Sequence, residues 1–241
     1  MVKARGDADG DDPPRPRPAI VLWSRIMPAL PENARGVSLL FRLWSGFYDN
    51  PLPQRLFYRR VHRRIVLRWQ PAYRQRVLDV GCGTGLFLNN LALEHDGLEL
   101  NGLDLSEHML AQAQRGARAS RSPAPTFVQG SVYEMPFADG AFDVALNTIS
   151  CHFYLEQVRA FREVGRVLSP GGRFFCAAMT SGALGRASLA GIAVYHPVPV
   201  LQEHFRQAGF EVEACERMFP FVALFELRKP GESARGAMAA G

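Results

Sequence analysis

The stretch VLDVGCGTGLF, residues 77–87, constrains the fold of this chain more than any other feature. A short apolar run, typical of a buried strand, reaches Gly81, and two more glycines follow at positions 83 and 85 before a helical pattern begins. Glycine allows backbone angles closed to other residues and lets a ligand lie against the main chain. The start of the helix offers unpaired N–H groups to an anionic group. The stretch therefore predicts a strand–turn–helix unit with a ligand site at the turn.

From residue 76 onward, short apolar runs alternate with helical stretches. The predicted strands are 76–81, 98–105, 125–131, 142–148, 172–179, 211–218 and 221–228, and the predicted helices are 84–95, 106–119, 153–168 and 197–208. Strands that alternate with helices of this length form a mostly parallel sheet covered by helices on both faces. Only a short turn at Phe219–Pro220 separates the last two strands, so we expect them to pair antiparallel.

The composition along the chain predicts four segments. Residues 1–18 are rich in Gly, Asp, Pro and Arg and are expected to be disordered, as is the tail 230–241. Residues 19–75 combine aromatic and aliphatic positions with arginines at helical spacing, and we expect an N-terminal helical lid or substrate segment there. The length of 241 residues allows one α/β domain with extensions. We expect this domain, which would bind the ligand, at residues 76–229, where strands and helices alternate.

Composition also disfavours several classes of protein. No apolar run approaches the ~20 residues of a membrane-spanning helix. An acidic run precedes the best candidate, AIVLWSRIMPAL, so we expect no export signal. The four cysteines, Cys82, Cys151, Cys176 and Cys215, lie far apart without a CxxC pair. This pattern argues against a zinc site and a disulfide framework, and it predicts a cytoplasmic protein without a metal.

The spacing of the glycines and of two aspartates decides between nucleotide cofactors. A dinucleotide-binding turn needs a glycine at position 86, where this chain has Leu86. Asp79, two residues before the first glycine, would repel a pyrophosphate but suits a ligand with a positive charge. Asp104 ends the second strand 19 residues after Gly85, about where an acidic residue binds ribose hydroxyls. S-adenosylmethionine, a nucleoside with a cationic and an anionic end, fits this pattern.

Four blocks, VLDVGCGTG, LDLSEHMLAQAQ, MPFADGAFDVALNT and VGRVLSPGGRFF, follow one another along the chain. Together they resemble the class I S-adenosylmethionine-dependent methyltransferases, of the small-molecule type with a methyltransferase domain 11-like core, over residues 76–228. The resemblance implies an α/β fold: a Rossmann-like, doubly wound, seven-stranded sheet that is mostly parallel with an antiparallel C-terminal strand. It also implies S-adenosylmethionine as the cofactor.

The resemblance further implies which residues hold the cofactor. Asp79 and the glycine turn correspond to residues at its methionine end, and Asp104 to the ribose ligand. The motif FYDN resembles a segment whose tyrosine closes over the cofactor. The third strand of the family is usually followed by Gly-Asp, whereas this chain has Gly130–Ser131, which weakens or replaces a contact with adenine. The implied set is Tyr48, Asp79, Gly81, Cys82, Gly83, Thr84, Gly85, Asp104, Leu105, Met109, Gly130, Ser131, Val132, Asn147 and Thr148.

The residues that meet the methyl acceptor are less well defined by the sequence. His152 follows the fourth strand at the rim of the site and is a candidate general base, with packing against Phe153 as the alternative. Phe153, Tyr195 and His196 are candidate substrate contacts. Methyl transfer from a sulfonium is an in-line displacement in which the protein mainly positions the acceptor and excludes water. Aromatic residues between positions 23 and 69 favour a small apolar acceptor, such as a quinone, a lipid or a secondary-metabolite scaffold.

The arginine-rich segment from Arg55 to Arg68 has three interpretations. A solvated helix face is favoured, peripheral contact with an anionic membrane comes second, and nucleic acid is not expected, since the net charge of +5 is weak evidence for it. Three alternative functions stay open: methylation of RNA or protein, non-catalytic binding of S-adenosylmethionine, and, least favoured, a nicotinamide-dependent reductase.

Overall fold

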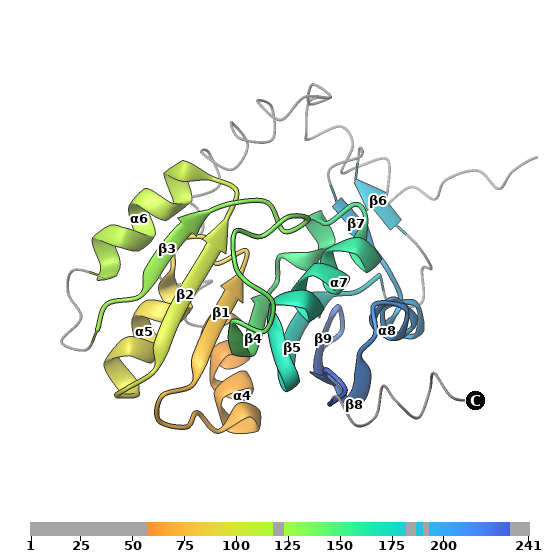
Figure 1. Cartoon of the computed structure of the whole chain (residues 1–241). Helices are drawn as coiled ribbons and strands as arrows, with labels where there is room; N and C mark the ends of the chain where they lie inside the picture. The colour runs from red at the N-terminus through yellow and green to blue at the C-terminus, as the bar shows by residue number, and fades with distance from the viewer. Residues whose placement is uncertain (1–56, 118–122, 182–186, 190–192, 232–241) are drawn as a thin grey trace, which may run out of the picture.

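The computed structural model describes residues 57–117, 123–181, 187–189 and 193–231 of the chain. Its centre is a seven-stranded sheet in the order β3-β2-β1-β4-β5-β9-β8 (Figure 1). The strands are β1 (Arg76–Val80), β2 (Glu99–Asp104), β3 (Thr126–Gln129), β4 (Phe142–Thr148), β5 (Leu168–Met179), β8 (Glu211–Phe219) and β9 (Val222–Arg228). Neighbours pair in parallel except β9, which is antiparallel to both β5 and β8. The predicted sheet, with its antiparallel C-terminal strand, is confirmed.

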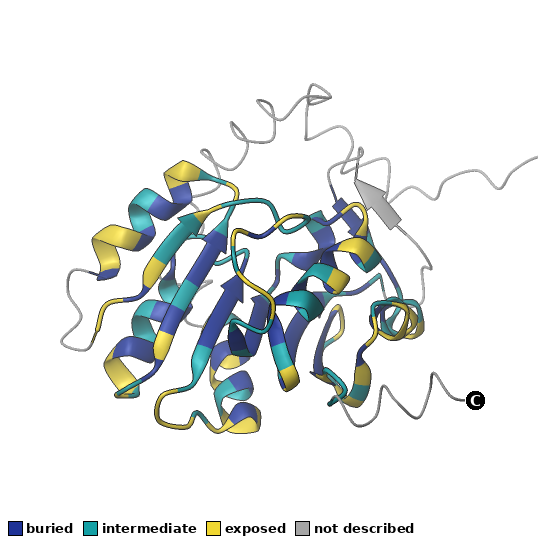
Figure 2. Cartoon of the chain, viewed as in Figure 1, coloured by how far each residue is buried: buried dark blue, intermediate teal, exposed yellow. Residues whose placement is uncertain are grey.

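Helices cover both faces of the sheet, and Figure 2 shows the central strands as almost wholly buried between them. The α-helices of the described chain are α4 (Arg59–Trp69), α5 (Leu86–Glu94), α6 (Glu107–Ala117), α7 (Gln157–Val167) and α8 (Val198–Gln207). On one face, Val61 and Ile65 of α4 share an apolar core with Leu88 of α5. On the other, Phe161 of α7 packs against Phe205 of α8, with ring centroids 4.4 Å apart. This is the doubly wound arrangement that the alternating pattern predicts.

Charged side chains also hold α4 against the sheet. Arg64 and Arg68 of α4 each place a guanidinium nitrogen 2.9 Å from the carboxylate of Glu216 on β8. Arg68 lies 3.4 Å from Glu226 of β9, and Arg173 of β5 approaches the same carboxylate at 3.5 Å. Two arginines of the segment that sequence assigns to a solvated or membrane-facing surface therefore attach α4 to the last two strands.

Three elements differ from the prediction. The helix expected at 153–168 begins only at Gln157, because a short 3-10 helix, η2 (Cys151–Phe153), comes first. Strand β5 begins at Leu168 rather than at 172, and the segment before Arg173 bulges out of register with β4. A small hairpin of β6 (Ala187–Leu189) and β7 (Ala193–Tyr195) was not expected, since three-residue strands give too little alternation to recognise.

The predicted terminal segments fall largely outside the described residues. Residues 1–18 are not described, the lid segment 19–75 is described only from Phe57, and the tail 230–241 is described only to Gly231. Within the described part of the chain, no helix is long and apolar enough to cross a bilayer.

Candidate functional site

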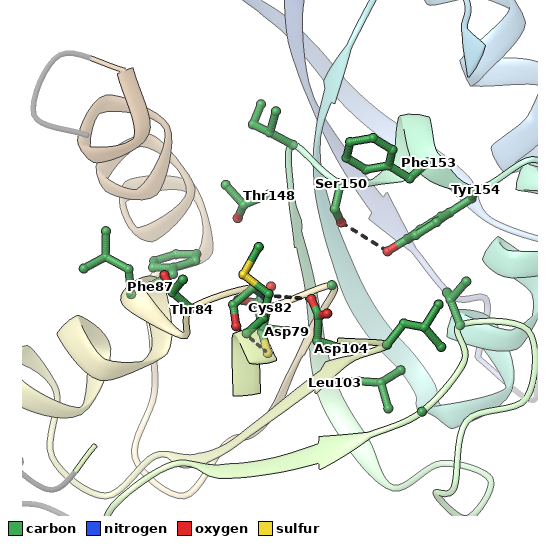
Figure 3. Close-up of a pocket in the computed structure, with 18 of the residues that line it drawn as sticks. Asp79, Cys82, Thr84, Phe87, Leu103, Asp104, Thr148, Ser150, Phe153 and Tyr154 are labelled. Atoms are coloured by element: carbon green, nitrogen blue, oxygen red, sulfur yellow. Dashed lines mark hydrogen bonds between the residues drawn. The ribbon is translucent and has the colours of Figure 1, made fainter. Parts of the chain in front are cut away.

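A pocket lies at the carboxyl ends of β1, β2 and β4, beside the β1–β4 pair where the strand order reverses (Figure 3). Ligands of open α/β sheets bind at this position. The cavity has a volume of about 270 Å³, comparable to the smaller ligand pockets of ~300 Å³. Its described lining consists of Tyr58, His62, Asp79, Gly81, Cys82, Gly83, Thr84, Leu86, Phe87, Leu103, Asp104, Leu105, Met109, Gly130, Ser131, Val132, Tyr133, Thr148, Ile149, Ser150, Phe153, Tyr154 and Leu155.

The glycine turn between β1 and α5 forms one wall of the pocket. Gly81, Gly83 and Gly85 have φ angles of 74°, 55° and 70°, in the left-handed region that other residues rarely adopt. A Cβ on Gly85 would lie 2.7 Å from both Ala113 and the ring of Phe127, so packing also requires this glycine. A Cβ on Gly83 would meet no atom within 4 Å. Gly83 therefore leaves open space in which a ligand can approach the backbone.

Two carboxylates, Asp79 and Asp104, lie together in the pocket (Figure 3). Asp104 accepts hydrogen bonds from the backbone N–H groups of Gly83 and Ser106, both at 2.9 Å. Asp79 is buried, and its Oδ1 has no hydrogen-bond partner among the described residues. Burial, with a smaller contribution from the charge of Asp104, raises the pKa of Asp79 to about 7. Burial likewise raises the pKa of Asp104.

The charge of the pocket selects its ligand. The described lining contains no lysine or arginine beside Asp79 and Asp104. A buried carboxylate is destabilised unless an opposite charge or hydrogen-bond donors accompany it. The two aspartates therefore favour a ligand that brings positive charge to Asp79 and hydroxyl groups to Asp104.

A group of hydrogen bonds fixes the chain after β4. The side-chain nitrogen of Asn147 lies 2.8 Å from the carbonyl oxygen of Val80 and 2.7 and 2.8 Å from the hydroxyls of Ser150 and Tyr154. Ser150 and Tyr154 line the pocket, and their hydroxyls are 3.1 Å apart (Figure 3). Asn147 is fully buried beneath them and is not part of the described pocket lining, so its predicted contact with the cofactor stays a prediction. Asn147 positions two residues that do line the pocket.

The remaining wall of the pocket is apolar and aromatic. Tyr58 and His62 reach it from the N-terminal end of α4, Phe87 from α5, and Phe153 and Leu155 from the segment after β4. The rings of His62 and Phe87 stack, with centroids 4.1 Å apart and planes 6° apart. Phe87 and Phe153 flank the pocket in Figure 3. This wall suits an apolar molecule that contains a ring.

The structure gathers most of the predicted cofactor residues in this pocket. They are Asp79, Gly81, Cys82, Gly83, Thr84, Asp104, Leu105, Met109, Gly130, Ser131, Val132 and Thr148. Gly85 does not line it and instead begins α5 behind the turn. Tyr48 lies outside the described residues.

The predicted acceptor residues are only partly in the pocket. Phe153 lines it, whereas His152, Tyr195 and His196 do not. His152 is buried between neighbouring rings, with centroids 4.1 Å from Phe153 and 5.2 Å from Tyr195, and burial lowers its pKa to about 4. The surroundings of His152 match the alternative of packing against Phe153, and its role as a general base stays a prediction.

Several pocket residues were missed by sequence reasoning. Tyr58 belongs to the aromatic residues between positions 23 and 69 that favour an apolar acceptor, but His62 was not singled out, and only its helical spacing with Tyr58 and Ile65 indicated a common face. Ser150 and Tyr154 follow β4, but nothing local marks them as partners of Asn147.

Comparisons with known proteins agree with this geometry. Residues 78–176 match the family model described as a methyltransferase domain. The chain is 31% identical over 168 residues to a malonyl-[acyl-carrier protein] O-methyltransferase of Erwinia pyrifoliae, covering 70% of this chain and 60% of that protein. It is 29% identical over 235 residues to the O-methyltransferase cnsE of Penicillium expansum, covering 90% of this chain and 83% of that protein.

Among solved structures, the crystal structure of the [4+2]-cyclase SpnF aligns with a TM-score of 0.65 at 25% identity. The alignment covers 71% of this chain and 80% of that one. The chain thus spans about three fifths of the length of the Erwinia relative and most of the length of the other two proteins.

The pocket also fits the cofactor that these comparisons imply, S-adenosylmethionine. Asp79 and the open backbone at Gly83 suit its cationic methionine end, and Asp104 suits the ribose hydroxyls. Ser131 lines the pocket where the family usually has an aspartate, and its hydroxyl accepts a hydrogen bond from the backbone N–H of Tyr133 at 3.2 Å. S-adenosylmethionine is therefore the cofactor that the sequence and the pocket both indicate, and solved structures titled as S-adenosylmethionine-dependent methyltransferases share the fold.

Proposed function

Because the chain belongs to the class I S-adenosylmethionine-dependent methyltransferase family, we propose that it transfers a methyl group to a small, neutral, largely apolar acceptor by in-line displacement. The observation that carries this proposal is a single pocket in which a buried carboxylate pair and an aromatic wall occur together. The first suits the cofactor, and the second suits an acceptor placed next to it.

Different residues of the pocket would bind the cofactor and the acceptor. Asp79 and the turn at Gly83 would hold the methionine end of the cofactor, and Asp104 would hold its ribose. The cofactor supplies a methyl group already activated on a sulfonium. The aromatic wall would orient the acceptor and exclude water, and such positioning can contribute on the order of 7–11 kcal/mol to a reaction between two molecules.

The charge of the pocket argues for a neutral acceptor. The relative from Erwinia pyrifoliae is named for a malonyl group, which ends in a carboxylate, and a carboxylate needs a cationic partner when it is buried. The described pocket lining offers two aspartates and neither lysine nor arginine. The name of the Penicillium relative specifies only an O-methyltransferase and is compatible with a neutral acceptor.

A product assay tests the proposal. The purified chain would be incubated with S-adenosylmethionine and, in separate reactions, with a quinol, a phenolic polyketide, a phospholipid, a malonyl thioester and a transfer RNA. Mass spectrometry would then detect S-adenosylhomocysteine and a product heavier by one methylene group. Turnover of a neutral small acceptor supports the proposal. Turnover of the malonyl thioester or the RNA alone, or of no acceptor, contradicts it.

One observation favours a second candidate function. The fold of this chain is shared with a protein whose structure is named as a [4+2]-cyclase. A chain of this family could therefore bind S-adenosylmethionine and act on an apolar ligand without transferring the methyl group. In that case the ligand would be converted to a product of unchanged mass, and S-adenosylhomocysteine would not form.

A cytoplasmic location and a peripheral membrane contact stay predictions. The exposed arginines of α4 are Arg59, Arg60, Arg63 and Arg68, and the last of these also pairs with Glu216. Binding of the chain to vesicles that contain anionic lipid, reduced by replacing Arg59, Arg60 and Arg63 with serine, would support the contact.

A further inference from the structure

His62 is a buried histidine that also lines the pocket. It lies on α4, lines the pocket and is 9% exposed. Its ring stacks on Phe87, which fixes the plane of the imidazole. Nδ1 is enclosed without a hydrogen-bond partner among the described residues, which leaves Nε2 as the nitrogen that can face a ligand in the pocket.

Other groups in the pocket are already engaged or unsuitable. Asp79 and Asp104 belong to the cofactor end of the site. The hydroxyl of Tyr154 is hydrogen-bonded to Asn147. His152, the candidate from the sequence, does not line the pocket and packs behind Phe153. His62 is therefore the histidine that the described part of the chain presents to the pocket.

From this geometry we propose that the acceptor carries a hydroxyl on an aromatic ring, and that the imidazole of His62 receives the hydrogen bond, and then the proton, of that hydroxyl. This inference rests on the proposed methyl transfer and names its acceptor class. The acceptor ring would lie within the wall formed by Tyr58, Phe87 and Phe153. The role requires the His62 tautomer with its proton on Nδ1, so that Nε2 carries the lone pair.

Methylation of a hydroxyl group requires a base that takes up the hydroxyl proton, and this is the role that we assign to His62. When an oxygen–carbon bond forms and the methyl–sulfur bond breaks, the hydroxyl proton must leave, and one proton reaches solvent for each turnover. Burial lowers the pKa of His62 to about 3, so the imidazole stays neutral over the whole physiological range. Such a weak base leaves the free hydroxyl protonated. It accepts the proton as positive charge develops on the oxygen during transfer.

The experiment uses the full chain loaded with S-adenosylhomocysteine and two probes, 4-nitrophenol and its methyl ether 4-nitroanisole, in which a methyl group replaces the hydroxyl proton. The titrations are made at a pH below the pKa of 4-nitrophenol, so that the probe keeps its hydroxyl proton. The variant is His62→Phe, which keeps a ring against Phe87 but removes both nitrogens. The matched control is His152→Phe, since this histidine is also buried but does not line the pocket. Calorimetry gives the affinities, and ¹⁵N NMR of the wild type reports the tautomer of His62.

We expect His62→Phe to weaken 4-nitrophenol binding at least fivefold, while the affinities for 4-nitroanisole and S-adenosylhomocysteine change less than twofold. His152→Phe should leave all three unchanged, and 4-nitrophenol should shift the Nε2 resonance of His62. The inference is overturned if wild type binds S-adenosylhomocysteine but not 4-nitrophenol, or if His62→Phe binds both probes as wild type does. Failure of wild type to bind S-adenosylhomocysteine would instead contradict the proposed function itself.

Discussion

Two groups of acidic side chains in this protein have opposite surroundings. Asp79 and Asp104 are buried in the pocket, where the described lining supplies no cationic side chain. Glu216 lies at the edge of the sheet and is paired with Arg64 and Arg68 of α4. Burial raises the pKa of Asp79 to about 7, whereas the hydrogen bond from Arg64 lowers the pKa of Glu216.

The difference indicates that the pocket aspartates serve ligand binding, whereas Glu216 stabilises the folded structure. A carboxylate with a raised pKa opposes folding at neutral pH, whereas one with a lowered pKa supports it. The pocket aspartates thus lower stability in a way that a cationic ligand would reverse. The ion pairs of Glu216 instead fix α4, the helix that places Tyr58 and His62 in the pocket.

The largest expected effect is on the pH dependence of stability. Asp79 has a folded-state pKa raised to about 7 from an ordinary value of 3.8, so the folded protein binds a proton that the unfolded chain has lost between these values. The free energy of unfolding of the wild type should therefore fall relative to Asp79→Asn as pH rises from about 4 to 7, by up to ~1.4 kcal/mol per pH unit, and level off above 7.

Glu216→Gln supplies the contrast for this measurement. The pKa of Glu216 is lowered from 4.5, so its ion pairs should stabilise the protein above that pH and lose their effect as the pH falls below it. Because the pairs are partly exposed, the loss in Glu216→Gln at pH 7 should be about 1 kcal/mol or less. Urea unfolding of the ligand-free proteins at pH 3.5, 4.5, 6 and 7.5 gives both curves. If the free energy of unfolding had the same pH dependence in wild type and in Asp79→Asn, Asp79 would not have a raised pKa in the folded protein, and the contrast with Glu216 would be wrong.

The second effect is on affinity for the cofactor. Loss of a hydrogen bond to a charged group costs ~1.5–3 kcal/mol, so Asp79→Asn should bind S-adenosylmethionine roughly 10–100-fold more weakly at pH 8. Glu216→Gln should bind it within twofold of wild type, because Glu216 does not line the pocket. Equal losses in the two variants, measured by calorimetry, would mean that the two groups of acids do not differ in function.

The third effect compares two glycines that both have a positive φ angle. Gly83 and Gly171 have φ angles of 55° and 77°, and a Cβ on either would meet no atom within 4 Å. Alanine at either position should cost ~1–2 kcal/mol of stability through the left-handed backbone. Only Gly83→Ala should also weaken S-adenosylmethionine binding, because only Gly83 lines the pocket. A loss of affinity in Gly171→Ala that matches the loss in Gly83→Ala would show that the effect comes from stability alone.

The smallest effect concerns Ser131, which stands where the family usually has an aspartate. Ser131→Asp should strengthen the binding of S-adenosylmethionine by a few-fold, about the ~1 kcal/mol of one added hydrogen bond to the adenine amino group. Inosyl analogues of the cofactor, which lack that amino group, should show no gain. Tighter binding of both ligands would assign the effect to charge instead.

How much the sequence predicts differs between these regions. The strand, the glycine turn and Asp104 depend on local backbone geometry, so the sheet and most of the residues that line the pocket around the glycine turn were predictable from motif and spacing. The acceptor wall depends on tertiary contacts. Tyr58 and His62 reach the pocket only because α4 docks on β8 and β9, whose glutamates lie about 150 residues later in the chain.

Two predicted site residues that lie outside the described pocket lining show the same dependence on tertiary contacts. His152 comes four residues after the end of β4 and lies within the short helix η2. In this helix its ring packs against Tyr195 and does not line the pocket. Asn147 is used for hydrogen bonds to Ser150 and Tyr154, partners that no local pattern indicates. Local motifs thus specify the cofactor site, while side-chain orientation after a strand end requires the tertiary structure.

The most direct test of the account is calorimetric titration with S-adenosylmethionine at pH 6.5 in two buffers of different ionisation enthalpy. A cation bound beside Asp79 should lower the pKa of this group from about 7, so binding should release a measurable fraction of a proton. Asp79→Asn should bind more weakly and release none of this fraction. Binding by the wild type without proton release, or no binding at all, would contradict the assignment of the carboxylate pair to a cationic cofactor.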